Sequence, residues 1–107
     1  MSAVTPDALA AQIASGTAPV ILDVRSQEEF RSGHVPGAIH VPFWQVRDRA
    51  LSIPATPRDP IIVYCGHGPR AWMAGAALRR RGFMRVMYLA GHMSAWRKAG
   101  LREERQT

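Results

Sequence analysis

Short apolar runs alternate with helix-like segments along this chain, and the alternation constrains the fold more than any other feature. The runs at residues 20–24, 38–41, 61–64 and 86–89 are rich in β-branched and aromatic side chains, which is typical of strands. Strands that alternate with helices pair in parallel, because each helix carries the chain back across the sheet. The sequence therefore predicts an α/β domain with a mostly parallel sheet flanked by helices.

Residues that cap helices mark the boundaries between these segments. Thr5 followed by Pro6 is a typical helix start, and Gly16 is a typical helix end. Ser26 and Glu29 have the spacing of a capping box, in which each side chain binds the backbone amide of the other residue. The predicted helices cover residues 5–16, 26–33, 43–50, 70–81 and 93–99.

Size and charge limit the functions that the chain can have. Its 107 residues suit one domain over 1–107, with a core at about 5–101 and a charged tail at 102–107. No apolar run reaches the ~20 residues that cross a bilayer, and no secretory signal begins the chain. With one cysteine there is no internal disulfide, so we expect a cytoplasmic protein without a membrane partner. The net charge of +6 favours anionic substrates or acidic partners, but no nucleic-acid-binding module is recognisable.

Cys65, the only cysteine, stands at the end of the strongest predicted strand, before a glycine-rich loop and a helix. A lone cysteine is more often a buried apolar residue than a nucleophile. This one, however, lies at the strand end where open α/β sheets bind their ligands. Gly66 and Gly68 permit loop conformations that turn backbone amides toward the sulfur. The available amides are those of Gly66, His67, Gly68, Arg70 and Ala71, because Pro69 has none.

These loop amides, the positive end of the following helix and the charge of Arg70 all favour a thiolate at Cys65. A helix terminus alone contributes about 0.3–1 kcal/mol, which is less than one pKa unit, so the amides and Arg70 are needed as well. The thiolate has two chemistries open to it. It can attack a sulfur donor and hold a persulfide, or attack a phosphate and hold a phosphocysteine.

Four segments, in this order, resemble the motifs of the rhodanese family, and together they span the chain from about Thr5 to Leu101. They are residues 23–25 with Glu29 and Phe30, residues 33–38, residues 65–70, and residues 82–83 and 89–91 with Trp96 and Gly100. The resemblance implies a rhodanese-like, five-stranded sheet and no cofactor. It also implies a six-residue active loop that encloses a persulfide, because related cysteine phosphatases use a loop one residue longer.

By this resemblance Cys65 carries the sulfur, Arg70 closes the loop, and residues 66–71 hold the outer sulfur atom. The chain departs from the family pattern at two positions. Ala71 stands where a serine is frequent, and the missing hydroxyl suggests weaker or different donor binding. His92 replaces the second glycine of a usual Gly-Gly pair, and we expect it either to cap the last helix or to reach the pocket rim.

The remaining polar residues have mainly structural interpretations. Asp23, Arg25 and Glu29 are interpreted as an ion-paired network that fixes the turn beside the site, with Asp23 and Arg25 in a supporting role. His34 and His40 are expected to be hydrogen-bonded residues of the scaffold. The four histidines and one cysteine lack the paired spacing of a metal site, so no metal is expected.

Three functions stay open from the sequence. One is an enzyme that takes sulfane sulfur from a small anionic donor such as thiosulfate and passes it to cyanide, a thiol or a protein. Another is a sulfur carrier or regulatory module that docks an acidic protein on its basic face, which Ala71 favours. A cysteine phosphatase or arsenate reductase is disfavoured by the short loop. The ring of His67 either contacts the donor or has no role beyond its amide.

Overall fold

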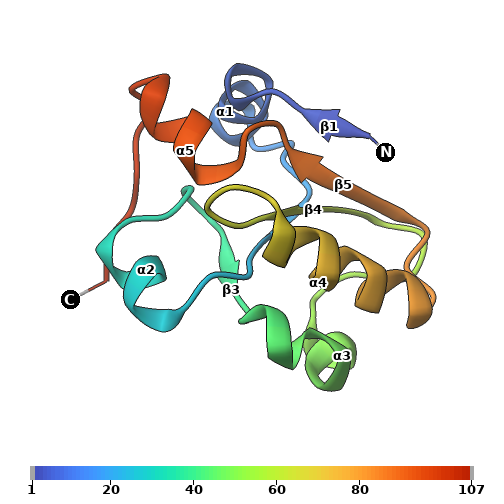
Figure 1. Cartoon of the computed structure of the whole chain (residues 1–107). Coiled ribbons are helices and arrows are strands. Elements are labelled where there is room, and N and C mark those ends of the chain that lie inside the picture. The colour runs from blue at the N-terminus through green and yellow to red at the C-terminus, as the bar shows by residue number, and fades with distance from the viewer. Residues whose placement is uncertain (1, 107) are drawn as a thin grey trace.

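The computed structural model describes residues 2–106 and consists of a five-stranded sheet with helices on both faces (Figure 1). The strands are β1 (Ala3–Val4), β2 (Val20–Asp23), β3 (Ile39–His40), β4 (Pro60–Tyr64) and β5 (Arg85–Leu89). Their order across the sheet is β1-β5-β4-β2-β3, and every neighbouring pair is parallel. The predicted α/β class and five-stranded sheet are confirmed. The sequence did not predict β1, since two residues carry no measurable periodicity.

The helices are α1 (Pro6–Ser15), α2 (Gln27–Ser32), α3 (Val46–Arg49), α4 (Pro69–Arg80) and α5 (His92–Lys98). The single helix predicted at 43–50 is instead a broken one, because the short 3-10 helices Phe43–Gln45 and Ala50–Ser52 flank α3. None of these three pieces has a side-chain cap at its N-terminus, so each lacks a contact that stabilises a helix end. No helix within residues 2–106 is long and apolar enough to span a membrane.

Each face of the sheet carries its own hydrophobic core. On one face Leu9 of α1 and Trp96 of α5 pack against Tyr64, and on the other face Leu78 of α4 packs in a cluster with Val63. Strand β4 contributes to both cores, because successive side chains of a strand point to opposite faces. Figure 1 shows this layering, with α1 and α5 on one side of the sheet and α3 and α4 on the other.

The predicted caps are present in the structure. The Thr5 hydroxyl accepts a hydrogen bond from the amide of Ala8 at 3.2 Å. Gly16 ends α1 in a left-handed conformation with φ of 74°. Ser26 and Glu29 form both halves of the capping box at the start of α2. These contacts are local in sequence, which is why the sequence predicted them.

The charged segment after α5 is attached to the body of the domain. The amide of Glu104 donates to the carbonyl of His34 at 2.9 Å, and the amide of His34 donates back at the same distance. The indole of Trp96 donates to the carbonyl of Arg102 at 3.0 Å. Residues 102–106, which were predicted to lie outside the core, are therefore attached to α2 and the loop after it.

Gly75 lies in the middle of α4, where the helix packs closely on the sheet. An alanine at Gly75 would stabilise an isolated helix by about 1 kcal/mol, but here its methyl group would collide with the hydroxyl and ring of the buried Tyr88. We expect Gly75→Ala to lower the free energy of unfolding by about 1–3 kcal/mol in urea denaturation. The loss should shrink in a Tyr88→Phe background, and a stabilised single variant would contradict this packing.

Candidate active site

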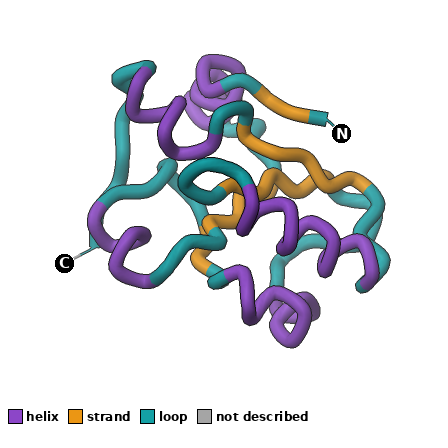
Figure 2. Tube along the Cα trace, in the orientation of Figure 1, coloured by secondary structure: helices purple, strands orange, loops and turns teal. Residues whose placement is uncertain are grey.

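Cys65 directly follows β4, and a short loop connects it to the start of α4 (Figure 2). The amide of Gly68 donates a hydrogen bond to the Cys65 Sγ atom at 2.9 Å. Gly68 has φ of 143°, and a Cβ atom there would come within 3.2 Å of the Trp72 ring. Glycine at this position therefore allows both the bend of the loop and its close approach to α4.

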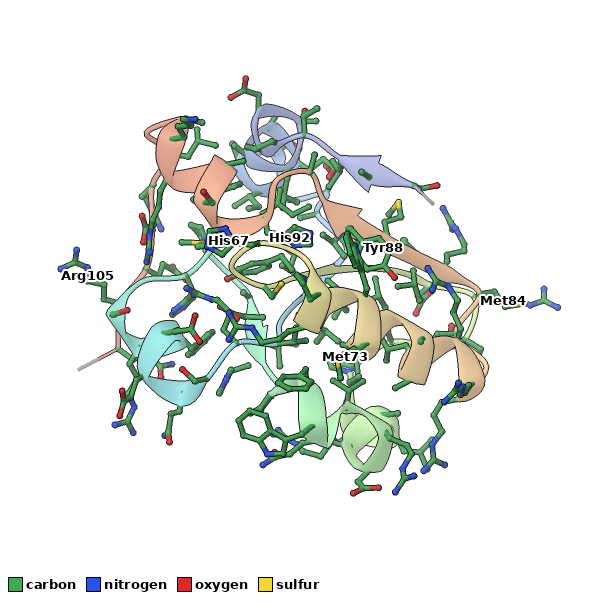
Figure 3. The ribbon with its side chains drawn as sticks, in the orientation of Figure 1. His67, Met73, Met84, Tyr88, His92 and Arg105 are labelled. Atoms are coloured by element: carbon green, nitrogen blue, oxygen red, sulfur yellow. The ribbon has the colours of Figure 1, made fainter. Side chains whose placement is uncertain are left out.

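The first turn of α5 lies against the other side of the loop. The amides of Met93 and Ser94 donate to the carbonyls of Cys65 and Gly66, at 2.9 and 3.3 Å. His92 accepts a hydrogen bond at Nδ1 from the amide of Cys65 at 3.2 Å. Figure 3 shows the side chain of His92 beside the loop that carries His67. His92 is only 5% exposed and makes no cap bond, so neither role expected for it is found.

Arg70, in the first turn of α4, pairs with Glu29 of α2. Their ion pair has two contacts, Nη1 to Oε1 at 2.6 Å and Nη2 to Oε2 at 3.1 Å. The same Oε1 atom accepts hydrogen bonds from the amide and hydroxyl of Ser26. The hydrogen bond from Arg70 lowers the pKa of Glu29 to about 2, against the opposing effect of burial, and the bonds from Ser26 add to the lowering.

Asp23 and Arg25 form a separate, buried network at the ends of β2 and β4. Arg25 Nη2 donates to the Asp23 carboxylate and to the carbonyl of Gly33, each at 2.7 Å. The hydroxyl of Tyr64 donates to Asp23 at 2.7 Å and accepts the amide of Val35 at 3.1 Å. Burial and the charge of Asp23 raise the pKa of Tyr64. The predicted Asp23–Arg25 pair is confirmed, but Glu29 pairs with the loop arginine and not with this network.

The environment of Cys65 favours the thiolate over the thiol. Burial raises the pKa of the thiol, but hydrogen bonds outweigh this effect and bring the pKa from 9.0 to about 7. The lowering comes from the His92 side chain and from the backbone amides of Ala71 and Gly68, and the Gly68 amide is the one that lies 2.9 Å from Sγ. At neutral pH a substantial share of Cys65 is therefore ionised and nucleophilic.

A pocket of about 300 Å³ opens over the loop. Its lining includes the side chains of Arg25, Arg70 and Arg97, with Glu29 as the single carboxylate. His67 is exposed and also lines the pocket, so its ring is accessible to a bound molecule. Each of these arginines is also paired with a carboxylate, so the pocket offers a small anion guanidinium hydrogen-bond donors and not a large net charge.

The two histidines expected in the scaffold are confirmed there. His34 contacts the carbonyl of Phe30 through Nδ1 at 2.7 Å, and His40 contacts the carbonyl of Arg25 through Nε2 at 2.8 Å. Both rings stack on the ring of Phe30, with centroid distances of 3.7 and 4.8 Å. Neither histidine is among the residues that line the pocket over the loop.

Comparison with known proteins shows the family of this chain. Residues 5–99 match the rhodanese-like domain family. The chain belongs to this family. A rhodanese-like protein of known structure, Alr3790 from Anabaena, superposes with a TM-score of 0.86 at 30% identity, covering 96% of this chain and 92% of that one. The predicted resemblance and the rhodanese-like fold are thus confirmed.

Two relatives of this rhodanese-like domain have names that mention sulfur. A sulfurtransferase of Allochromatium vinosum is 32% identical over 95 residues, which cover 89% of this chain and 87% of the relative. YrkF of Bacillus subtilis, named as a sulfur carrier protein, is 36% identical over 76 residues. That match covers 71% of this chain but only 40% of YrkF, so the chain spans less than half of this relative.

Three residues of the site were missed or misplaced from the sequence. Glu29 was assigned to the wrong partner, the hydroxyl of Tyr64 was not considered, and His92 was not placed behind the cysteine. Glu29 is 41 residues from Arg70, and His92 is 27 residues from Cys65, so no local spacing reveals either contact. The only signal in the sequence was the departure from the family's usual glycine at His92.

The Glu29–Arg70 ion pair should make stability depend on pH in the acid range. Because its pKa falls from 4.5 to about 2 on folding, Glu29 stabilises the fold above pH 4.5, and this contribution is lost as the pH falls toward 2. The pair is partly exposed, so Glu29→Gln should remove about 0.5–1 kcal/mol at pH 7. Chemical denaturation of both proteins between pH 7 and pH 2 measures the difference.

The exposed neighbour Glu28 provides the matched control for this measurement. Glu28→Gln should follow the wild-type curve over the whole pH range. The difference between wild type and Glu29→Gln should close as the solution is acidified. If that difference is the same at pH 7 and pH 2, Glu29 does not contribute through its charge.

Proposed function

We propose that this domain is a sulfurtransferase that moves sulfane sulfur from a small anionic donor, such as thiosulfate, to a thiophilic acceptor through a persulfide on Cys65. The observation that carries the proposal is the six-residue loop, in which the Gly68 amide lies 2.9 Å from the Cys65 sulfur. A thiol pKa of about 7 supplies the nucleophile at neutral pH. The names of the relatives support the same chemistry.

The proposed cycle has two displacement steps and balances without a redox partner. The Cys65 thiolate attacks the outer sulfur of thiosulfate, the bond between the two donor sulfurs breaks, and sulfite leaves with the electron pair. Cys65 then holds a persulfide anion. An acceptor such as cyanide or a thiolate attacks the outer sulfur, the sulfur–sulfur bond breaks, and the electron pair returns to Cys65 as a thiolate.

The loop is proposed to stabilise the negative charge in both steps. Backbone amides of residues 66–71, Pro69 excepted, hold the outer sulfur, and Arg70 keeps a positive charge beside it. The arginines of the pocket attract the donor, and the exposed ring of His67 contacts it there. Asp23 and Arg25 act indirectly, because they hold in place the strand end that Cys65 follows.

Ala71 favours a second function, that of a sulfur carrier whose acceptor is an acidic protein or a small thiol. The side chain of Ala71 is fully buried beside the loop and offers no hydroxyl to a bound donor. Weak binding of small donors matters less if the sulfur is received from, or delivered to, a docked protein. The name of YrkF is consistent with a carrier role, and the net charge of +6 suits an acidic partner.

Loading with thiosulfate tests the proposed function directly. The protein should gain the mass of one sulfur atom, and added cyanide should release that sulfur as thiocyanate, while Cys65→Ala shows neither result. Rapid thiocyanate production supports an enzyme, and loading with slow release to cyanide supports a carrier. An unchanged mass in the wild-type protein, or phosphate release from an aryl phosphate instead, would reject the proposal.

Restoring the hydroxyl beside the loop tests the role given to Ala71. In Ala71→Ser a new hydrogen bond to the anionic donor or persulfide, worth about 1 kcal/mol, should lower KM for thiosulfate about fivefold. Ala74→Ser is the matched control, because Ala74 is equally buried one turn further along α4. Ala74→Ser should change the stability of the protein and leave KM for thiosulfate unchanged. A KM that is equal in all three proteins would show that the hydroxyl does not govern donor binding.

A further inference from the structure

His92 has a backbone conformation that histidine rarely adopts. Its φ is 56°, and it is the one residue other than glycine with positive φ among residues 2–106. The left-handed region is unfavourable for residues with a Cβ atom, and such outliers persist where the surrounding structure holds them. Gly91 before it has φ of 71°, so the chain makes a tight turn from β5 into α5 at this point. This turn brings the imidazole under the active loop.

The imidazole binds the backbone of Cys65 through one ring nitrogen, and its other ring nitrogen lies close to Gly68. Nδ1 accepts the amide hydrogen of Cys65 at 3.2 Å, which assigns the ring proton of the neutral imidazole to Nε2. Nε2 lies on the other side of the ring, 3.5 Å from the position that a Cβ atom would occupy on Gly68. Gly68 is the residue whose amide binds the Cys65 sulfur. The ring therefore extends from the backbone of the cysteine to the part of the loop that surrounds its sulfur.

We propose that His92 is a positioning residue that fixes Cys65 through Nδ1 and stabilises its thiolate through the Nε2 proton. The thiol proton itself leaves to solvent, so no proton is transferred to the imidazole. This role deepens the proposed function, since the thiolate is the nucleophile of that reaction. The His92 side chain also acts to lower the pKa of Cys65.

Other charged groups around the loop have partners of their own. Arg70, whose charge faces Cys65, is paired with Glu29, and Arg25 is paired with the buried Asp23. Arg97 at the pocket rim is paired with Glu103, and His67 is exposed to solvent. His92 differs from all of these because it is buried and its contacts are with Cys65 and the loop.

Alkylation of Cys65 by iodoacetamide at a series of pH values measures the thiol pKa without any sulfur substrate, and the single cysteine makes the labelled site unambiguous. His92→Gly and His92→Asn both tolerate positive φ, so neither should strain the turn. The asparagine oxygen can replace Nδ1 as acceptor, but the shorter side chain does not reach the sulfur. In both variants we expect the midpoint to rise from about pH 7 to about pH 8, with about fivefold less thiolate at pH 7.

His67→Asn is the matched control, because it removes a histidine from the pocket without touching the cysteine, and it should keep the wild-type midpoint. The midpoint and not the melting temperature decides, because loss of the buried imidazole and its hydrogen bond destabilises His92→Gly while relief of the backbone strain stabilises it. A purely structural role would leave the midpoint unchanged. If His92→Gly does not fold, the midpoint of His92→Asn decides.

An unchanged midpoint in the folded His92 variants would overturn the proposal, as would an equal shift in His67→Asn. These outcomes are separate from those of the proposed function. A protein that shows the shift but never loads sulfur retains the role of His92 and loses the sulfurtransferase assignment. A protein that loads sulfur but shows no shift retains the sulfurtransferase assignment and loses the proposed role of His92.

Discussion

The buried carboxylate of Asp23 is the group on which the active end of this domain depends. It has no exposure to solvent, and a buried charge is tolerated only when it is paired and hydrogen-bonded. Arg25 and the hydroxyl of Tyr64 supply those bonds, and each of them also binds the loop at residues 33–35. The carboxyl ends of β2 and β4 are thereby fixed relative to each other. Because Cys65 directly follows Tyr64, this network sets the point from which the active loop starts.

From that point the loop is held on two sides by interactions of different kinds. Behind it, the buried His92 and the amides of α5 bind the backbone at Cys65 and Gly66. In front of it, Arg70 and Glu29 form an ion pair that is about one-third exposed on each side chain. A buried contact is insensitive to salt, whereas a partly exposed pair is weakened by it. The contacts of His92 and α5 with the loop should therefore change little with salt. The Arg70–Glu29 pair should weaken as salt is added.

The sequence predicted the parts of this structure that depend on neighbours along the chain. The capping box of Ser26 and Glu29 was predicted from a spacing of three residues, and the strand–loop–helix around Cys65 from its apolar run and glycines. Glu29 also shows the limit of prediction from local spacing. The capping box was a sufficient reason for a glutamate at this position, so nothing in the sequence indicated a second partner. The bond of Glu29 to Arg70 depends on where α2 lies relative to the start of α4, which no spacing encodes. The short strand β1 was not predicted, and neither were the breaks in the helix expected at 43–50, because these segments carry too few periodic residues.

The closed shape of the loop itself favours sulfur over phosphate. Cys65 is only 1% exposed, so a reacting atom must enter the loop to reach Sγ. The sulfane sulfur of thiosulfate is a terminal atom and can enter alone, whereas the phosphorus of a phosphate ester is surrounded by four oxygens. With the Gly68 amide already 2.9 Å from Sγ, a tetrahedral group needs a wider loop, and the Arg70–Glu29 pair opposes such widening. This steric argument does not depend on the names of the relatives, and it favours the same chemistry.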